Sequence, residues 1–224
     1  TIIWTRNLVK SEHRMIKTPT RAYGGVTADQ RAAERKARLL EAALELFSRQ
    51  GYARTTIEAL CGEAKVTARH FYQLFDSREA LLRALYDNII ADLRAGVLQA
   101  MSAPKLSLSQ QIPLGVSAMV NHYLADSRLA RVGVLEVVGV SPQMEIRRRE
   151  AVHDMAGLIE AYLGSLVAQG DLPKRNYHLV SVALVGGINE LLAEWLTLEN
   201  PPDIPTLSEE IIHILNALIR GAAQ

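Results

Sequence analysis

Apolar residues recur every three or four positions along most of the chain, a spacing that predicts helices. No stretch alternates between apolar and polar residues for long enough to indicate a strand. We therefore expect an all-α fold. Beyond residue 107 the expected helices cover about 109–125, 127–139, 142–169, 175–198 and 207–221. Their apolar spacing is typical of a helical bundle.

Capping residues divide the first hundred residues into four helices. The expected N-caps are Thr27, Thr55, Thr67 and Ser77. Thr27 and Thr55 are followed three residues later by Gln30 and Glu58, which completes a capping-box signature at both places. Gly51 ends the first helix, because glycine tolerates the left-handed conformation of a helix end. The fourth helix extends to about residue 101.

The second and third helices are short and are joined by the brief turn 64–66, which is the pattern of a helix-turn-helix. Their inward positions are Ile57, Leu60, Cys61, Ala64, Ala68, Phe71, Leu74 and Phe75. The third helix presents Arg69 and Gln73 outward, with His70 and Tyr72 on its flanks. We expect a flexible basic tail at 1–26, a helix-turn-helix domain at 27–76 and a helical-bundle domain at 77–224.

A helix of this width fits the major groove of B-DNA, where arginine can donate two hydrogen bonds to guanine and glutamine can pair with adenine. We assign base reading to Arg69 and Gln73, with His70 as a third candidate. The residues assigned to phosphate contacts are Thr56, Lys65, Thr67, Tyr72 and Arg78. A merely solvated surface helix is the competing interpretation of the same polar face.

The charge distribution agrees with a nucleic-acid partner for the first part of the chain. The net charge is +1, but residues 1–86 hold 15 Lys and Arg against 9 Asp and Glu, and the remainder holds 10 against 15. Only the front of the molecule therefore suits a polyanion. Part of the basic excess lies in the tail, where a solvated arm is the alternative.

Composition excludes several classes of protein. With 49% hydrophobic and 22% charged residues the chain is an ordinary globular protein, and its single cysteine excludes an internal disulfide framework. The longest apolar stretch, Leu179–Ile188, is interrupted and too short to span a membrane, so we expect a soluble, cytoplasmic protein. No nucleophile with a positioned base, cofactor loop or paired metal ligands is present, and we expect no enzyme activity, cofactor or metal.

The segment from Arg38 to Tyr86 reads RLLEAALELFSRQGYARTTIEALCGEAKVTARHFYQLFDSREALLRALY. It resembles the tetracycline-repressor (TetR) family of bacterial transcription regulators in its Gly-Tyr, paired threonines, helix-turn-helix and closing Phe-x-x-basic-Glu-x-Leu. The resemblance implies DNA contacts at Thr56, Thr67, Arg69, His70 and Tyr72. Two departures stand out: Lys65 occupies a turn position that usually holds glycine, and Arg78 replaces the usual lysine.

The resemblance also implies that residues 77–224 form a ligand-binding and dimerisation domain whose last two helices pair in a homodimer. Gly186 and Gly187 would allow close backbone approach there. Apolar stripes accompany them on both helices, at Ile188, Leu191, Trp195, Ile211, Leu215 and Leu218. A two-fold dimer would place its recognition helices about 34 Å apart, one turn of the operator.

A ligand, if the family mechanism holds, enters the bundle core and changes the separation of the recognition helices. The candidate lining residues are Met119, Tyr123, Glu136, Met155, Tyr162 and Asn189. Core packing is the competing role for the apolar ones. Glu136 lies within the apolar run 132–140, where a carboxylate must be exposed, paired or presented to a ligand.

These observations lead to one interpretation: a dimeric, DNA-binding transcriptional repressor that a small molecule releases from a palindromic operator. The alternative is a helical small-molecule-binding protein that no longer reads DNA. DNA binding that is weak and does not change with salt concentration would favour that alternative.

Overall fold

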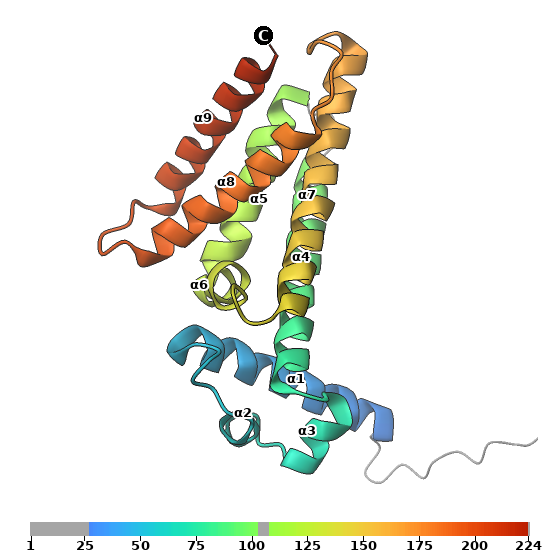
Figure 1. Ribbon diagram of the computed structural model, residues 1–224, viewed down its shortest axis with the longest axis vertical. Coiled ribbons are helices and arrows are strands. Elements are labelled where there is room, and N and C mark those ends of the chain that lie inside the picture. Colours follow the sequence, from blue (N-terminus) through green and yellow to red (C-terminus); the bar gives the residue numbers. More distant parts are fainter. Residues whose placement is uncertain (1–26, 103–107, 224) are drawn as a thin grey trace, which may run out of the picture.

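The computed structural model describes residues 27–102 and 108–223, which form α-helices and one π-helical turn, without a strand (Figure 1). The all-α expectation is thus confirmed for the described residues, and the tail at 1–26 lies outside them. The elements are α1 (Ala28–Gln50), α2 (Ile57–Ala64), α3 (Ala68–Leu74), α4 (Arg78–Met101), α5 (Leu108–Ala125), α6 (Ser127–Ala130), η1 (Arg131–Glu136), α7 (Pro142–Gln169), α8 (His178–Thr197) and α9 (Ile204–Ala222).

Helices α1 to α3 pack together at one end of the molecule, and their buried residues belong to the same hydrophobic core as those of the bundle (Figure 1). Leu39, Phe47, Leu60 and Phe71 are completely buried in it. Three of the expected N-caps form: Thr27 and Gln30 make the full capping box, while Thr67 and Ser77 accept backbone N–H groups at the starts of α3 and α4. Local sequence signals therefore set these helix boundaries.

The predicted cap of the second helix is wrong by one residue. Thr56 is the N-cap of α2, and its hydroxyl accepts the Ala59 N–H. Thr55 is instead completely buried, and its hydroxyl donates to the Gly51 carbonyl at 2.8 Å. Two adjacent threonines carry the same local signal, and the tertiary core decides which one caps. Ala68 is also a correction, because it is exposed on α3 rather than turned inward.

Helix α4 joins the two parts of the molecule. It begins beside α3 and runs the length of the bundle, where it packs against α5 and α7 (Figure 1). Helix α8 packs on α7, α6 and η1, helix α9 packs on α5, and α8 and α9 pack on each other. The bundle core includes the completely buried Val120, Leu163 and Leu192.

The helix expected at 127–139 is only partly correct. The single turn α6 passes into the π-helical η1, which ends at Glu136. An extra residue in a π-turn shifts the helical register, and such turns are frequent at functional sites. The last two helices begin at 178 and 204 rather than at 175 and 207, with Pro205 in the first turn of α9.

Among the described residues, α8 alone is long and apolar enough to cross a membrane by length and composition. Leu184, Val185, Ile188 and Leu192 on this helix are buried against neighbouring helices. The core helix of a soluble protein meets the same criteria, so the composition of α8 is weak evidence for a membrane span.

Candidate functional site

The turn between α2 and α3 is held by an unusual backbone conformation. Lys65 has φ 52° and ψ 47°, and among the described non-glycine residues it is the only one with positive φ. Its N–H donates to the carbonyls of Cys61 and Gly62, which completes the end of α2. The following Val66 is buried beneath the turn. The expected helix-turn-helix geometry is thus present, with lysine in a position that favours glycine.

The outer face of α3 is polar and accessible. Arg69 and Gln73 are exposed, as predicted, and Tyr72 keeps 56% of its surface accessible. His70 is half-buried, and its Nδ1 lies 3.0 Å from the Thr67 hydroxyl. Because His70 is occupied by the helix cap, Arg69 and Gln73 are better placed to reach bases.

The hydroxyls of Thr56 and Thr67 stand at the starts of α2 and α3. Each accepts a backbone N–H of its own helix, from Ala59 at 3.2 Å and from His70 at 3.4 Å. A hydroxyl that accepts in this way can still donate its own proton. The Thr56 hydroxyl can therefore cap its helix and donate to a phosphate oxygen at the same time, and the Thr67 hydroxyl can do so when His70 Nδ1 carries the proton of their contact.

The structure gives Arg78, predicted to contact phosphate, two partners within the protein. Its guanidinium lies 4.2 Å from the centre of the Tyr52 ring and donates to the carbonyl of Thr55. A half-buried arginine engaged in this way holds the segment before α2 against α4. Arg78 is thus placed to position Thr56 rather than to contact phosphate itself.

The comparisons with known proteins agree with this geometry. The sequence profile described as "Bacterial regulatory proteins, tetR family" matches residues 39–85, which span α2, α3 and parts of α1 and α4. Residues 39–85 therefore carry a DNA-binding domain of the tetR family. The protein is a DNA-binding transcriptional regulator of the helix-turn-helix type.

The likeness to individual relatives extends beyond the matched domain. The regulator is 26% identical over 186 residues to the probable HTH-type transcriptional regulator ArpR of Pseudomonas putida, covering 78% of this chain and 86% of ArpR. It is 25% identical to the HTH-type transcriptional regulator TtgR of Pseudomonas putida, covering 78% of this chain and 86% of TtgR. The solved structure of the transcriptional regulator FadR of Bacillus subtilis in complex with stearoyl-CoA superposes with a TM-score of 0.73 at 18% identity, covering 83% of this chain and 98% of FadR.

Inside its bundle the regulator has an apolar cavity of ≈ 70 Å³, between α4, α5, α7, α8 and α9. Met119, Met155 and Tyr162, three of the predicted lining residues, stand in its wall. The other walls are aliphatic or methionine side chains, and no charged residue is among them. We call this space the apolar cavity.

A neighbouring space of ≈ 50 Å³ shares Met119, Met155 and Val185 with the apolar cavity. Tyr123 and Asn189, also predicted, line it together with Tyr86 and Arg148. We call it the mixed cavity. Gly133 of η1 also lines it, and a Cβ there would stand 3.0 Å from the Tyr123 ring. Glycine therefore allows η1 to lie against this tyrosine.

Glu136 does not line either cavity, so the cavities give no support to its predicted role in ligand binding. Its carboxylate accepts the Tyr52 N–H at 2.8 Å, just after the end of α1. Partial burial of the Glu136 carboxylate within an apolar run would cost free energy if it had no partner, and the hydrogen bond from the Tyr52 N–H of the helix-turn-helix domain offsets this cost. As a result η1 lines the mixed cavity with Gly133 and contacts the DNA-binding domain with Glu136.

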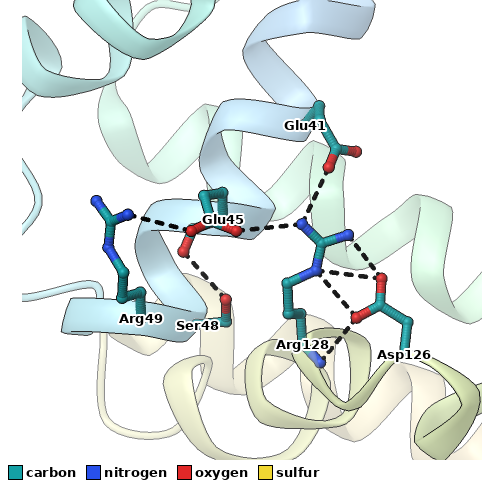
Figure 2. Close-up of polar contacts among 6 residues, drawn as sticks. All are labelled: Glu41, Glu45, Ser48, Arg49, Asp126 and Arg128. Atoms are coloured by element: carbon teal, nitrogen blue, oxygen red, sulfur yellow. Dashed lines mark hydrogen bonds and ion pairs between the residues drawn. The ribbon is translucent and has the colours of Figure 1, made fainter.

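Figure 2 shows a second link between the domains, centred on Arg128 of α6. Its guanidinium lies 2.7 Å from Asp126, 3.1 Å from Glu41 and 3.2 Å from Glu45, the last two on α1. Hydrogen bonds from Arg128 hold the pKa of the Asp126 carboxyl below its ordinary value. Glu45 also pairs with Arg49 of its own helix.

The outer surface of α8 and α9 corrects part of the predicted dimer stripe. Ile188, Ile211 and Leu215 are buried within one chain, at 5%, 1% and 4% exposure, so they belong to its interior. Gly186, Gly187 and Leu218 are exposed, whereas Leu191 and Trp195 are partly covered. The exposed apolar positions on these helices are Leu179, Ile214 and Leu218.

Sequence reasoning missed three functional candidates: Arg128, Tyr86 and Arg148. Within the run of three arginines at 147–149, Arg147 pairs with Asp87 at 2.6 Å and Arg148 pairs with Glu145 at 3.0 Å. The acidic residues that flank the arginine run were a signal that could have suggested pairing. Nothing local predicts that Arg128 reaches α1, because its partners lie more than 80 positions earlier.

Proposed function

We propose that this regulator is a repressor that binds a palindromic operator as a homodimer and leaves it when a small molecule enters the bundle. The exposed polar face of α3, set on a completed helix-turn-helix, is the observation that carries the proposal. Arg69 and Gln73 read bases, with His70 secondary, and Thr56, Lys65, Thr67 and Tyr72 fix the register on phosphates. The protein acts in the cytoplasm, without catalytic activity.

The proposed dimer uses the outer face of α8 and α9. Leu179, Ile214 and Leu218 expose 79%, 39% and 48% of their surfaces there, and a Cβ added at Gly186 or Gly187 would meet no atom within 4 Å. A second copy related by two-fold symmetry would cover these apolar groups and admit close helix contact. Two recognition helices then face successive major grooves.

Release by a ligand follows from the elements that line the cavities. Helix α4 contributes Tyr86 and Val97 to cavity walls and begins at the helix-turn-helix domain, and η1 joins the mixed cavity to Tyr52 through Glu136. A ligand that moves α4 or η1 therefore moves the recognition helix. Such a ligand shifts the equilibrium only as far as it binds the two arrangements unequally.

Selection of bound fragments from randomised DNA by the purified protein, at about 150 mM salt, tests the proposal. We expect a palindrome, and Arg69→Ala should lose about 1–3 kcal/mol of binding free energy and relax preference at one base position per half-site. Arg149→Ala, an exposed arginine on α7, is the matched control and should leave both unchanged. Recovery of no motif, also with cell extract added, would favour a ligand-binding protein that no longer reads DNA.

A further inference from the structure

The two cavities differ in chemistry although they adjoin. Met119, Met155 and Val185 form their shared wall. On one side every lining group except the Tyr162 hydroxyl is hydrocarbon, methionine or glycine. On the other side the wall includes Tyr86, Tyr123, Arg148 and Asn189, four residues whose side chains carry polar groups. A ligand that occupied both would need an apolar body and one polar end.

The polar groups of the mixed cavity are mainly hydrogen-bond donors. Burial raises the pKa of Tyr86 to about 12 and raises the pKa of Tyr123 as well, so both phenols keep their protons at neutral pH. No hydrogen bond joins either hydroxyl to another described residue. Two phenols that line a cavity with unused donors suit a ligand that brings an acceptor oxygen.

The charge at this end favours an anion over a cation. Arg148 lines the mixed cavity, whereas none of the described residues in the walls of the two cavities is acidic. Glu145 offsets part of the charge, since its carboxylate accepts a hydrogen bond from Nε of Arg148 at 3.1 Å and lies 3.0 Å from Nη2 in an ion pair. Nη1 is not part of that pair and can donate to a carboxylate. Arg148 is about one-third exposed, which places the polar end toward solvent.

The walls of the apolar cavity can adapt to a longer body. Met101, Met119 and Met155 line it, and methionine has three rotatable bonds and fills irregular space. A space of ≈ 70 Å³ holds only a short group before these side chains move. Met101 lies at the end of α4, so its movement would also displace α4, the helix that begins at the DNA-binding domain.

We propose that the effector of this regulator is an amphipathic carboxylic acid, with its aliphatic body in the apolar cavity and its carboxylate held by Tyr86, Tyr123 and Arg148. The role of this acid as an effector rests on the proposed function, whereas its chemical class follows from the two cavities alone. It assigns Arg148 and the two phenols as specificity-determining residues.

Calorimetric titration of the full-length protein with matched eight-carbon probes tests the ligand class. Octanoate should bind at least tenfold more tightly than octan-1-ol or octylamine, which share its body and differ at the polar end. Hexanoate should bind about 15-fold more weakly than octanoate, since each buried CH₂ contributes about fourfold. Equal affinity for octylamine, or tighter binding of octanoyl-coenzyme A, would overturn the assignment of a free carboxylate.

Two variants test where the carboxylate of the ligand binds. Tyr123→Phe removes one hydroxyl without changing the shape of the core, and Arg148→Met removes the charge while keeping much of the stem. Each should weaken octanoate about tenfold and leave octan-1-ol binding within about twofold. Arg149→Met is the matched control and should bind like the parent protein. Unchanged octanoate affinity in both cavity variants would contradict the proposal.

Operator release separates this inference from the proposed function. Octanoate should dissociate the complex with the selected operator at concentrations near its calorimetric Kd. Tight, Arg148-dependent octanoate binding without release would support the ligand class and refute the effector role. Failure of the protein to select any DNA would refute the proposed function, while the titrations would still decide the ligand class.

Discussion

At the scale of single residues, the helix-turn-helix depends on a lysine in a conformation that most side chains avoid. Lys65 occupies the left-handed region, at the end of α2, where the Cβ of an L-residue crowds the following carbonyl. Its backbone N–H is fully used by the carbonyls of α2. The conformation is therefore retained because the turn requires it, at a local cost of about 1–2 kcal/mol.

Replacement of Lys65 separates this strain from its charge. Lys65→Gly should raise the free energy of unfolding by about 1 kcal/mol relative to Lys65→Ala, because only glycine relieves the left-handed strain. Both variants lose the same positive charge, so both should weaken operator and non-specific DNA binding to a similar degree. Urea unfolding and DNA titration measure the two effects. Equal stability of the two variants would contradict the strain at this position.

Single residues also show where local signals end. Thr27, Thr67 and Ser77 cap the helices that their sequence context predicts, because a cap needs only neighbours within four residues. Thr55 and Thr56 could not be separated in this way. Thr55 is buried, and its hydroxyl donates to the Gly51 carbonyl at the end of α1. This burial depends on the tertiary packing of the segment that follows α1.

At the scale of elements, α6 and η1 connect the bundle to the DNA-binding domain. Arg128 binds carboxylates of α1, and Glu136 accepts the Tyr52 N–H. Both contacts are made by a short helical segment whose register shifts through the π-turn. The same segment lines the mixed cavity through Gly133. We therefore expect coupling between ligand and DNA to pass through this segment as well as through α4.

Arg128→Met tests the contribution of this contact to coupling. Each ion pair is partly exposed, so the variant should lose less than about 1 kcal/mol of stability per pair. The ratio of operator affinities without and with octanoate should fall toward one, because α1 is less firmly attached to α6.

Arg49→Met is the matched control for that experiment. Arg49 also pairs with Glu45, at 3.2 Å, but it lies on α1 itself and makes no link between the domains. Its ratio of operator affinities should equal that of the parent protein. If Arg128→Met kept the parent ratio as well, coupling would pass through α4 or Glu136 rather than through this ion-pair cluster.

At the scale of the whole molecule, the proposed dimer depends on which stripes of α8 and α9 stay uncovered. Apolar residues occupy several faces of these helices, so their periodicity alone does not decide which face is buried in the bundle and which faces a second copy. Packing on the bundle uses Ile188, Ile211 and Leu215 and leaves Leu179, Ile214 and Leu218 outside. The exposed stripe, together with Gly186 and Gly187, is the surface that a second copy would cover.

Leu218→Glu should break the proposed dimer, because a carboxylate would be buried without a partner in the interface. Light scattering should give the mass of one chain where the parent gives two, and affinity for a full palindrome should fall to that for a half-site. Val138→Glu is the matched control: Val138 is 55% exposed and belongs to the turn after η1 rather than to α8 or α9. A Leu218→Glu protein that remained dimeric would move the interface elsewhere.

The helical class, most helix boundaries, the helix-turn-helix and the outward residues of α3 all follow from local signals in the amino-acid sequence. These features depend on capping, periodicity and turn residues that lie within a few positions of one another. Only the tertiary structure decided that Arg128 and Glu136 bind the DNA-binding domain, that Arg148 joins two phenols at a cavity, and which faces of α8 and α9 are buried. The physical reason is that each of these outcomes depends on side chains brought together from distant helices, and helical periodicity carries no information about which distant face a residue meets.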